Sequence, residues 1–581
     1  MSTNLSKIRR DKMLNTISKI KENIDDEETL QNLSLIEYEL TKKKYGLLWE
    51  EHEEKVDEEL KTKIPTFEEV KDKEIVSNKD DKFNFLLEGD NLHSLYLLEK
   101  THKGKIDVIY IDPPYNTGNK DFVYDDNFVE SEDGFKHSKW ISFMERRLKI
   151  AYYLLRNEGV IFISVDDKEQ SQLKMICDEI FGEDNFIACM PRRTKSSGKT
   201  TNKISANHDY VLIYEKVKNQ SIIAGIQHND EGFRYEDEYV TERGKYKLNQ
   251  TLDYDSLSYS SSLDYPIEID GVTLYPGGDY EKYKERQNGN YKRADWAWRW
   301  SKDLFEFGLK NGFIVVKKGK NGLPRIYTKT YLNAKIQKDD IEGYKIVIEE
   351  RTKPMSSIEF VESKYSNDNA KKDLVKIFGN SEFDYPKPVE LLKTIISIYN
   401  NKDATILDFF AGSGTTGQAV LELNNEDNGN RQFILCTNNE NNICEDITYQ
   451  RLKTVISGKR KDNTKYSDGI NANLKYYRTT YVPRINTDEE NIQENLLVNI
   501  KNLIQLENGI SVDDERIKVI LDEDEIDRFS INNEEVKHCE RLYISSDILL
   551  TAQQVKIFED NNVEVFIIPE YYFENEIKEV Q

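Results

Sequence analysis

Four residues, Asp112-Pro-Pro-Tyr115, place a carboxylate and an aromatic ring directly after the apolar run 107–112. The two prolines fix the backbone and have no N–H groups of their own, so their carbonyl oxygens remain available as acceptors. A planar base could stack on Tyr115 while its exocyclic amine donates hydrogen bonds to Asp112 and to the Pro113 carbonyl. Donation out of the ring plane makes the nitrogen more pyramidal, so that its lone pair can attack a sulfonium methyl, and Asp112 could accept the released proton. Taken alone, the four residues are also compatible with a simple turn at the end of a strand.

A second motif is a glycine-rich turn over 408–417, in which Gly412, Gly414 and Gly417 have the spacing G-x-G-x-x-G. Glycines at this spacing allow a tight turn from strand to helix and a close approach of the backbone to a ligand. The pattern fits a dinucleotide, S-adenosylmethionine, or a tight turn without a ligand. In both ligand interpretations an acidic residue after the next strand should hold ribose hydroxyls, and Glu440 is the candidate. An ordinary exposed loop acid explains Glu440 equally well.

These motifs need a scaffold that brings them together, and the apolar pattern predicts one. Short apolar runs alternate with helical patterns from about residue 81, and again after 371, which is typical of a parallel α/β sheet. Residues 217–350 lose this alternation and are rich in Tyr, Gly, Asn and Ser. We therefore expect one sheet assembled from two stretches of sequence around an insertion. The expected strands are 107–112, 160–165, 207–215, 405–410 and 432–436, and the expected helices are 137–156, 171–181, one from Pro388 and one from Thr416.

The order of the motifs resembles that of the β-class amino methyltransferases, and specifically the Mod subunits of type III restriction–modification systems. In that family D-P-P-Y precedes the F-x-G-x-G cofactor loop, with a target-recognition region between them, as Tyr115 and Phe410 bracket the insertion here. Further segments similar to the Mod pattern are IYIDPPYNTGNKDFVYDDNF, RYEDEYVTERGKYKL, LDYDSLSYSSSLDYPI, WAWRWSK and TNNENNICEDITYQR. The resemblance is strong over residues 80–460 and weaker at the ends.

The fold that this resemblance implies is α/β, with a Rossmann-like S-adenosylmethionine-dependent methyltransferase sheet. Its parts would be a helical N-terminal arm (1–65), a catalytic half (66–216), a target-recognition insertion (217–350), a cofactor-binding half (351–480) and a small acidic α/β domain (481–581). The implied catalytic residues are Asp112, Pro113, Pro114 and Tyr115. The implied cofactor-binding residues are Asp90, Asn91, Lys387, Pro388, Asp408, Phe410, Gly412, Gly414, Thr415 and Glu440.

Two of these roles are more specific. The pair Lys387-Pro388 would help to enclose the methionine end of the cofactor, and Asp90 would lie near its adenine. Asp90 is also well placed as the N-cap of a helix that starts at Asn91, and the two roles are compatible.

The activity that the resemblance implies is methyl transfer from S-adenosylmethionine to N6 of adenine in double-stranded DNA, with the target base flipped out of the stack. Transfer to N4 of cytosine uses the same amine chemistry, although that branch more often has S-P-P-Y. An NAD-dependent oxidoreductase that used the glycine-rich turn would have no chemical role for D-P-P-Y. A DNA-recognition scaffold for a nuclease would not need an intact D-P-P-Y motif. The family further implies a homodimer and a Res subunit, an ATP-dependent nuclease and translocase, as partner.

The charge distribution is compatible with DNA binding despite a net charge of −24. Residues 481–581 contain 9 basic and 24 acidic residues, whereas residues 191–330 contain 24 basic and 19 acidic residues. DNA affinity depends on local Lys and Arg side chains that face phosphate, so we expect contacts from Arg192, Arg193, Lys195 and Lys199. The acidic tail should face away from DNA or toward a protein partner. Trp296, Trp298 and Trp300 could contact bases, but they fit the core of the insertion better.

Several classes of protein are disfavoured. No apolar run approaches the roughly 20 residues that span a bilayer, and the N-terminal residues lack the apolar segment of a signal peptide, so a cytoplasmic location is expected. The five cysteines are scattered without a C-x-x-C pair, so neither disulfides nor a metal site is predicted. The N-terminal arm carries Leu33, Leu35, Ile36 and Leu40 in a helical pattern, which fits a dimerisation or docking element or a cap on the next domain.

Overall fold

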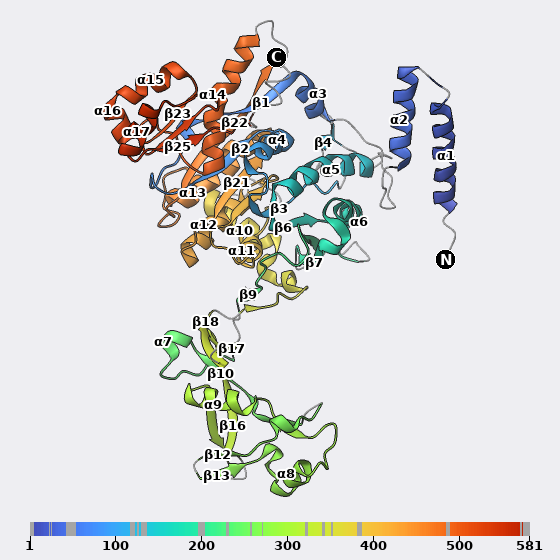
Figure 1. Cartoon of the computed structure of the whole chain (residues 1–581), viewed down its shortest axis with the longest axis vertical. Coiled ribbons are helices and arrows are strands. Elements are labelled where there is room, and N and C mark those ends of the chain that lie inside the picture. The colour runs from blue at the N-terminus through green and yellow to red at the C-terminus, as the bar shows by residue number, and fades with distance from the viewer. Residues whose placement is uncertain are drawn as a thin grey trace. The chain divides into compact units, whose positions relative to one another are not determined.

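The computed structural model of the chain describes residues 5–22, 24, 26–41, 54–116, 123–124, 127–128, 136–195, 204–227, 232–255, 258–269, 271–319, 324–339, 343–349, 352–379, 386–483, 489–569 and 572. The chain divides into two compact units (Figure 1). One consists of Met1–Ile222 together with Ser356–Gln581, and the other of Ile223–Met355. The second unit corresponds to the insertion expected at 217–350, and both of its boundaries lie a few residues further along the chain.

The first unit contains a nine-stranded sheet. Its strands are β1 (Lys63–Glu69), β2 (Phe83–Glu88), β3 (Ile106–Ile111), β6 (Leu155–Val165), β7 (Phe186–Arg193), β8 (His208–Glu215), β20 (Thr405–Asp408), β21 (Gln432–Thr437) and β22 (Asn473–Pro483). Their order is β1-β22-β2-β21-β20-β3-β6-β8-β7. The strands from β22 to β6 are parallel, whereas β1 and β8 run antiparallel to their neighbours in this group. Since β20 and β21 lie between β2 and β3, the expected α/β sheet built from two stretches of sequence is confirmed.

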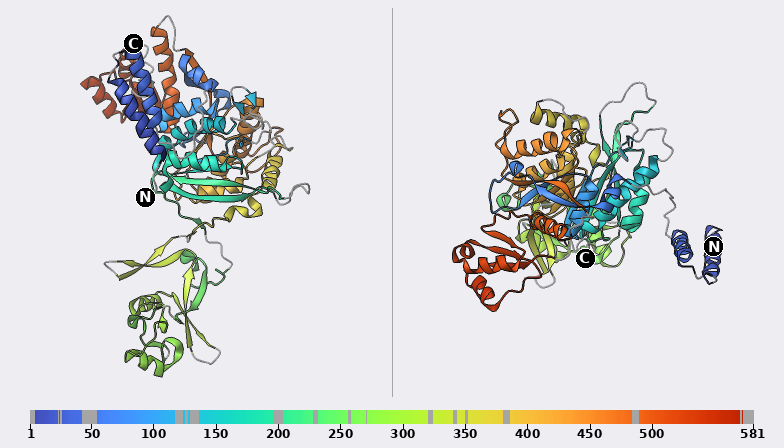
Figure 2. Two further views of the ribbon diagram at one scale, coloured as in Figure 1. Left: turned by 90° about the vertical axis from the view of Figure 1, so that its right-hand side faces the viewer. Right: turned by 90° about the horizontal axis from the view of Figure 1, so that it is seen from above.

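Helices cover both faces of this sheet (Figures 1 and 2). One layer consists of α4 (Asn91–His102), α5 (Lys136–Leu154), α6 (Gln170–Cys177) and α14 (Glu489–Asn508). The other consists of α11 (Val389–Ser397), α12 (Thr415–Asp427) and α13 (Gln450–Ser457), with α10 (Asn367–Phe378) packed on α13. In the first layer, Ile109 and Ile163 of the sheet share a core with Trp140 and Leu148 of α5. Burial of both faces explains why the central strands appear in the sequence as continuous apolar runs.

Several element boundaries differ from the expectations. Strand β1 starts at Lys63, so the boundary expected at residue 65 falls inside a strand that pairs with β22. Strand β22 crosses the boundary expected at 480, and Leu503 and Ile504 of α14 are part of the main core. The acidic C-terminal region therefore packs against the core of the large sheet through α14. The helix expected over 171–181 is α-helical to Cys177 and continues as one π-helical turn to Gly182.

A smaller three-stranded parallel sheet follows α14. Its strands are β23 (Ile517–Ile520), β24 (Arg541–Ile544) and β25 (Glu564–Ile567), and its helices are α15 (Glu523–Ile531), α16 (Asn533–His538) and α17 (Ala552–Asp560). It has a core of its own, which includes Leu542 and Phe558.

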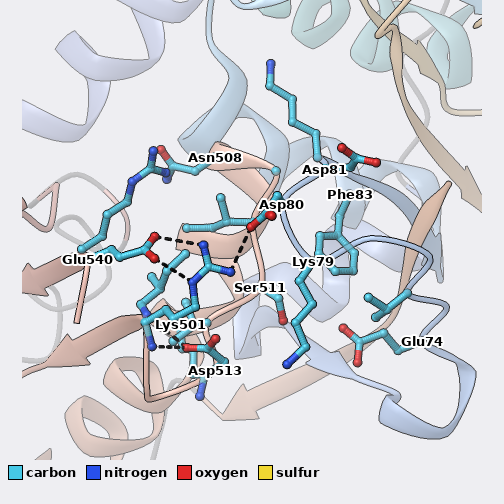
Figure 3. Close-up of a pocket in the computed structure, with 18 of the residues that line it drawn as sticks. Glu74, Lys79, Asp80, Asp81, Phe83, Lys501, Asn508, Ser511, Asp513 and Glu540 are labelled. Carbon is cyan, nitrogen blue, oxygen red and sulfur yellow. Dashed lines mark hydrogen bonds and ion pairs between the residues drawn. The ribbon is translucent and has the colours of Figure 1, made fainter. Parts of the chain in front are cut away.

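A cavity of about 570 Å³ lies where this small sheet meets the large one (Figure 3). Arg516 crosses the junction, since Nη1 donates a hydrogen bond to Asp80 at 3.0 Å while Nε and Nη2 bind Glu540 at 2.9 and 3.0 Å. None of the residues of the D-P-P-Y motif or the glycine-rich turn lines this cavity. The cavity is therefore part of the junction between the C-terminal sheet and the large sheet.

The described residues of the second unit form short antiparallel strands and three α-helices. Its elements are β9 (Ile226–Gln227), α7 (Val240–Arg243), β10 (Tyr246–Thr251), β11 (Asp253–Asp255), β12 (Ile267–Ile269), β13 (Val272–Leu274), α8 (Tyr280–Gln287), β14 (Trp296–Trp298), α9 (Lys302–Lys310), β15 (Ile314–Lys318), β16 (Pro324–Tyr331), β17 (Ala334–Asp339), β18 (Gly343–Ile348) and β19 (Thr352–Lys353). Trp298 is buried and Trp300 packs against the same cluster, so the expected core role holds for these two. Trp296 is 39% exposed.

The described residues of the N-terminal arm before β1 are mostly helical, as expected. Helices α1 (Leu5–Lys21) and α2 (Glu27–Thr41) contact each other and share an ion pair of 2.7 Å between Lys21 and Glu37. Helix α3 (Lys55–Thr62) leads directly into β1. A two-stranded ribbon, β4 (Val123–Tyr124) and β5 (Asn127–Phe128), precedes α5. Within the described ranges, no helix is both long and apolar enough to cross a membrane.

Candidate active site

The carboxyl ends of neighbouring parallel strands bring the two motifs to one edge of the large sheet. Asp112 follows β3 and Asp408 ends β20, and these two strands pair directly. The next strands in the sheet are β21 and β2, which are followed by Glu440 and Asp90. Because open α/β sheets bind ligands outside the carboxyl ends of their strands, this edge is the candidate site.

Lys387 links the D-P-P-Y motif to the glycine-rich turn. Its Nζ lies 2.5 Å from Oδ2 of Asp112 and donates a hydrogen bond of 2.8 Å to the hydroxyl of Tyr115. Its backbone carbonyl accepts a hydrogen bond of 3.3 Å from Oγ1 of Thr415, which belongs to the turn. The lysine side chain is 9% exposed, and a buried ammonium of this kind needs a close opposite charge, which Asp112 supplies.

The second carboxylate oxygen of Asp112 is unpaired among the described residues. Oδ1 is buried and has no hydrogen-bond partner among the described residues, although the side chain as a whole is 24% exposed. Buried oxygen atoms are rarely left unpaired in native structures, so an unpaired one at a candidate site points to a missing donor. The carbonyl of Pro114 is already taken by the indole of Trp140 at 2.6 Å. The Pro113 carbonyl is therefore the acceptor that remains for the second hydrogen of an amine.

Tyr115 is held at its hydroxyl from two sides. The hydroxyl accepts from Lys387 and donates to Oδ2 of Asp209 at 3.4 Å. Burial, followed by the negative charges of Asp112 and Asp209, raises the pKa of Tyr115 well above its usual value. The phenol therefore stays protonated at neutral pH, and its ring is fixed as a platform for stacking.

Arg192 does not have the role that the sequence suggested. Its side chain is fully buried, Nε donates to Oδ1 of Asp209 at 2.8 Å, and Nη1 donates to the Tyr365 carbonyl and to Asn367 at 2.9 Å each. The expectation of a phosphate contact is therefore wrong for Arg192, because its donors are used inside the protein. Arg193 is half-buried and Lys195 is exposed, so both can still face phosphate, while Lys199 lies outside the described residues.

The backbone after Tyr115 is fixed by Asn116, which has a positive φ of 54°. Its amide donates to the Lys136 carbonyl at 3.1 Å and to Oε1 of Glu169 at 2.6 Å, and His137 Nδ1 lies 2.7 Å from the same oxygen. Burial raises the pKa of the Glu169 carboxyl, and it outweighs the opposing effects of Asn116 and His137. These contacts join the end of the D-P-P-Y motif to the start of α5.

The glycine-rich turn has the backbone that its glycines predict. Gly412 and Gly414 have φ of 48° and 75°, and the Gly412 carbonyl accepts a hydrogen bond of 2.5 Å from Oγ1 of Thr448. A Cβ at Gly414 would lie 3.0 Å from Cγ2 of Thr448, so this glycine fits the turn against the protein. A Cβ at Gly417 would lie 2.6 Å from Leu452, so the third glycine allows α12 to pack closely on α13.

Asp408 shapes this turn from inside the protein. Its carboxylate is 2% exposed and accepts hydrogen bonds from the backbone of Phe410 at 3.0 Å and from the hydroxyl of Thr416 at 2.5 Å. Burial raises the pKa of Asp408 to about 7, because the loss of hydration outweighs these two hydrogen bonds. Phe410 is half-buried against Phe143, with 5.8 Å between ring centroids.

Two other cofactor candidates are engaged in protein contacts. The Thr415 hydroxyl accepts from Nη1 of the buried Arg451 at 2.8 Å, in addition to its bond with Lys387. Pro388 is buried at the N-cap position of α11. Both residues therefore determine the shape of the turn and of the neighbouring Lys387 segment.

Asp90 is the N-cap of α4, as expected, and accepts from the backbone of Leu92 at 2.7 Å. Asn91 connects β2 to the glycine-rich turn, because its amide donates to the Phe409 carbonyl at 2.8 Å. Its Oδ1 accepts from Nε of Arg147 at 2.6 Å, and Arg147 in turn binds Glu54 through two hydrogen bonds of 2.8 and 3.0 Å.

Glu440 is exposed at the start of a short 3₁₀ helix, Glu440–Asn442, after β21. Its neighbour Asn439 is used locally, since Oδ1 accepts from the backbone of Cys444 and Glu445 at 3.1 and 3.2 Å. An exposed carboxylate at this place can accept hydrogen bonds from hydroxyl groups of a ligand, whereas Oδ1 of Asn439 already accepts two backbone hydrogen bonds.

Sequence reasoning missed Trp140, Arg147 and Asp209. Arg147 does leave a signal, because it is a charged residue on the buried face of α5 between Met144 and Leu148. Asp209 pairs with Arg192 across β7 and β8, a register that opposite charges on two adjacent strands could have suggested.

Comparison with known proteins gives a consistent result. A family model described as DNA methylase, for N6 and N4 methyltransferases, matches residues 106–450, which is more than half of the chain. The type III restriction–modification enzyme StyLTI Mod subunit of Salmonella typhimurium is 29% identical over 452 residues, which cover 71% of this chain and 62% of that protein. The EcoPI Mod subunit of Escherichia phage P1 is 30% identical over 465 residues, which cover 71% of this chain and 66% of that protein.

A type II relative covers a larger share of its own length. The methyltransferase M.KpnI of Klebsiella pneumoniae is 33% identical over 364 residues, which cover 60% of this chain and 79% of that protein. The chain thus spans slightly less than two thirds of the two Mod subunits. The resemblance to Mod subunits that the motifs suggested is confirmed.

Proposed function

The chain belongs to the DNA methylase family, and on that premise we propose that it methylates N6 of adenine in double-stranded DNA with S-adenosylmethionine as methyl donor. We further propose that it is the modification and recognition subunit of a type III restriction–modification system. The observation that carries this proposal is the position of Lys387, whose ammonium binds Asp112 while its carbonyl accepts from Thr415. This one residue joins the group that would orient an amine to the turn that would bind a methyl donor.

The residues at the carboxyl edge of the sheet fit S-adenosylmethionine. Asp90 and Glu440 present exposed carboxylates, which suit the adenine amine and the ribose hydroxyls, and Phe410 presents part of an aromatic ring. Asn91, Asp408, Gly412, Gly414, Thr415 and Pro388 would form and support the turn around the ligand. When bound, this cofactor supplies a methyl group on a positively charged sulfur.

The chain's own residues would orient the target amine. The flipped adenine would stack on Tyr115, and its amine would donate one hydrogen to Oδ1 of Asp112 and the other to the Pro113 carbonyl. Transfer would form the nitrogen–methyl bond as the sulfur–methyl bond breaks, with the electron pair of that bond left on sulfur. Asp112 would accept the proton that the methylated amine releases.

Partners follow from the same family argument. Two of the relatives are Mod subunits by name, so we propose a homodimer that binds double-stranded DNA and, where a Res subunit is present, assembles with it. Arg193, Lys195 and Lys199 would contribute phosphate contacts. We expect the enzyme to act in the cytoplasm, where it meets unmodified DNA.

Transfer to N4 of cytosine is the second candidate, because the matching family model covers both N6 and N4 methyltransferases. Incubation of the purified chain with unmethylated DNA and labelled S-adenosylmethionine, followed by mass spectrometry of the nucleosides, distinguishes the two. The proposal predicts N6-methyladenine from the wild type and none from Asp112→Ala. N4-methylcytosine would establish the second candidate, and no labelled nucleoside would overturn both.

A further inference from the structure

We propose that Lys387 is a positioning residue for the target base, which selects Oδ1 of Asp112 as the acceptor of the amine and fixes the ring of Tyr115. This inference rests on the proposed methyl transfer and changes the part that the resemblance gave to Lys387, which was to enclose the methionine end of the cofactor.

The ammonium of Lys387 lies against the D-P-P-Y motif. Nζ is 2.5 Å from Oδ2 of Asp112 and 2.8 Å from the Tyr115 hydroxyl oxygen, so two of its three N–H donors are directed at the D-P-P-Y motif. Only the backbone carbonyl of Lys387 is directed at the glycine-rich turn, through Thr415. The side chain therefore acts on the amine-binding half of the site.

The two carboxylate oxygens of Asp112 have different surroundings. An isolated carboxylate can accept an amine hydrogen at either oxygen, and the two choices place the amine differently. Here Oδ2 is occupied by Lys387 and Oδ1 is buried and unpaired among the described residues. Since Trp140 occupies the Pro114 carbonyl, the remaining acceptors are Oδ1 and the Pro113 carbonyl, which defines one position for the amine.

Lys387 also determines the direction of the Tyr115 hydroxyl hydrogen. Lys387 donates to the oxygen of this hydroxyl, so the phenol must point its own hydrogen elsewhere, and Asp209 accepts it at 3.4 Å. Asp209 is in turn held by the buried Arg192. A continuous chain of hydrogen bonds thus runs from Asp112 through Lys387 and Tyr115 to Asp209 and Arg192, with a donor and an acceptor at every step.

Charge balance is consistent with this arrangement. A methyl donor with a positive sulfur would be repelled by a second, uncompensated cation in the same site. The Asp112 carboxylate neutralises the Lys387 ammonium at close range. The proton released by the methylated amine goes to Oδ1 of Asp112 and not to Lys387, so the residue acts through Asp112 and Tyr115.

The test compares Lys387→Met and Lys387→Arg with Lys393→Met as the matched control. Lys393 lies on α11, a short distance along the chain, and its largely buried ammonium also pairs with carboxylates, including Glu390 and Glu422. We would measure the affinity for S-adenosylhomocysteine by calorimetry and the methyl-transfer rate in a single turnover. Wild-type transfer in the same assay verifies the proposed function separately.

We expect Lys387→Met to bind S-adenosylhomocysteine within about twofold of the wild type, but to transfer the methyl group about 100-fold more slowly, the usual cost of a misplaced reacting group. Lys387→Arg, which keeps the charge and the donors, should recover part of that rate, and Lys393→Met should transfer at the wild-type rate. A large loss of S-adenosylhomocysteine affinity in Lys387→Met, or an unchanged transfer rate, would overturn the inference even if the wild type is fully active.

Discussion

Arg192 and Asp209 form a buried ion pair across β7 and β8, in which Nε donates to Oδ1 at 2.8 Å. The same guanidinium binds the Tyr365 carbonyl and Asn367, so it connects the strand before the insertion to the segment that follows it. Asp209 in turn accepts from the Tyr115 hydroxyl. The segments that flank the insertion on both sides are thus connected to the aromatic ring of the D-P-P-Y motif.

Replacement of Arg192 should therefore affect stability first. Arg192→Met leaves the buried Asp209 carboxylate without its cationic partner, which costs about 3–5 kcal/mol of the free energy of unfolding. Arg193→Met, at a half-buried neighbouring position, should change it by less than about 0.5 kcal/mol. Urea denaturation of both variants measures the difference, and equal stabilities would show that the pair is not structural.

Neutralisation of the remaining basic residues should affect DNA binding. In the triple variant Arg193→Gln, Lys195→Gln, Lys199→Gln, affinity should fall for all DNA sequences alike, because phosphate contacts carry no sequence information. The slope of log affinity against log salt should become shallower by about 0.9 for each phosphate that the variant no longer neutralises. Fluorescence anisotropy at several salt concentrations measures both quantities. An unchanged slope would mean that these side chains do not face phosphate.

Two substitutions at Tyr115 separate its ring from its hydroxyl. Tyr115→Ala removes the stacking surface and should weaken binding of DNA with a flipped target base by about 1–3 kcal/mol. Tyr115→Phe keeps the surface and removes only the hydrogen bonds with Lys387 and Asp209, so it should bind like the wild type and transfer the methyl group more slowly. Equal binding by the alanine and phenylalanine variants would argue against stacking.

Asp408 should make stability depend on pH. Its pKa is raised to about 7 in the folded chain, so between its ordinary pKa and pH 7 the folded state holds a proton that the unfolded state has released. The free energy of unfolding therefore decreases as the pH rises through this range and levels off above pH 7. Asp408→Asn lacks this dependence and should gain about 3 kcal/mol relative to the wild type between pH 5 and pH 8. Denaturation curves at both values test this, and a constant difference would contradict it.

The sequence was sufficient for elements whose apolar pattern is continuous. Strands β3, β20 and β21 lie close to their expected bounds because both faces of each are buried. Strand β6 starts at Leu155, before the expected residue 160, because its first part is largely exposed and has no continuous apolar pattern. The sequence was also sufficient for the glycine-rich turn, since Gly412 and Gly414 do adopt a left-handed backbone.

Charged residues were harder to predict from the sequence. Arg192 and Lys195 belong to one basic run, yet Arg192 is buried because Asp209 lies opposite it in the sheet, and Lys195 is exposed. The family resemblance of the Lys387-Pro388 pair places Lys387 at the cofactor, but the direction of its side chain depends on Asp112, far away in the sequence. Burial and pairing of a charge are properties of the folded sheet, and local composition does not contain them.

Adenine methylation through Asp112 leaves a record in the DNA of the cell that carries the enzyme. Methylation-sensitive long-read sequencing reads this record in DNA from a host that expresses the wild type, compared with a host that expresses Asp112→Ala. We predict one short sequence motif with N6-methyladenine at a fixed position in the wild-type DNA, and no modified motif in the variant DNA. Absence of methyladenine from both hosts, or the same modified motif in both, would contradict adenine methylation through Asp112.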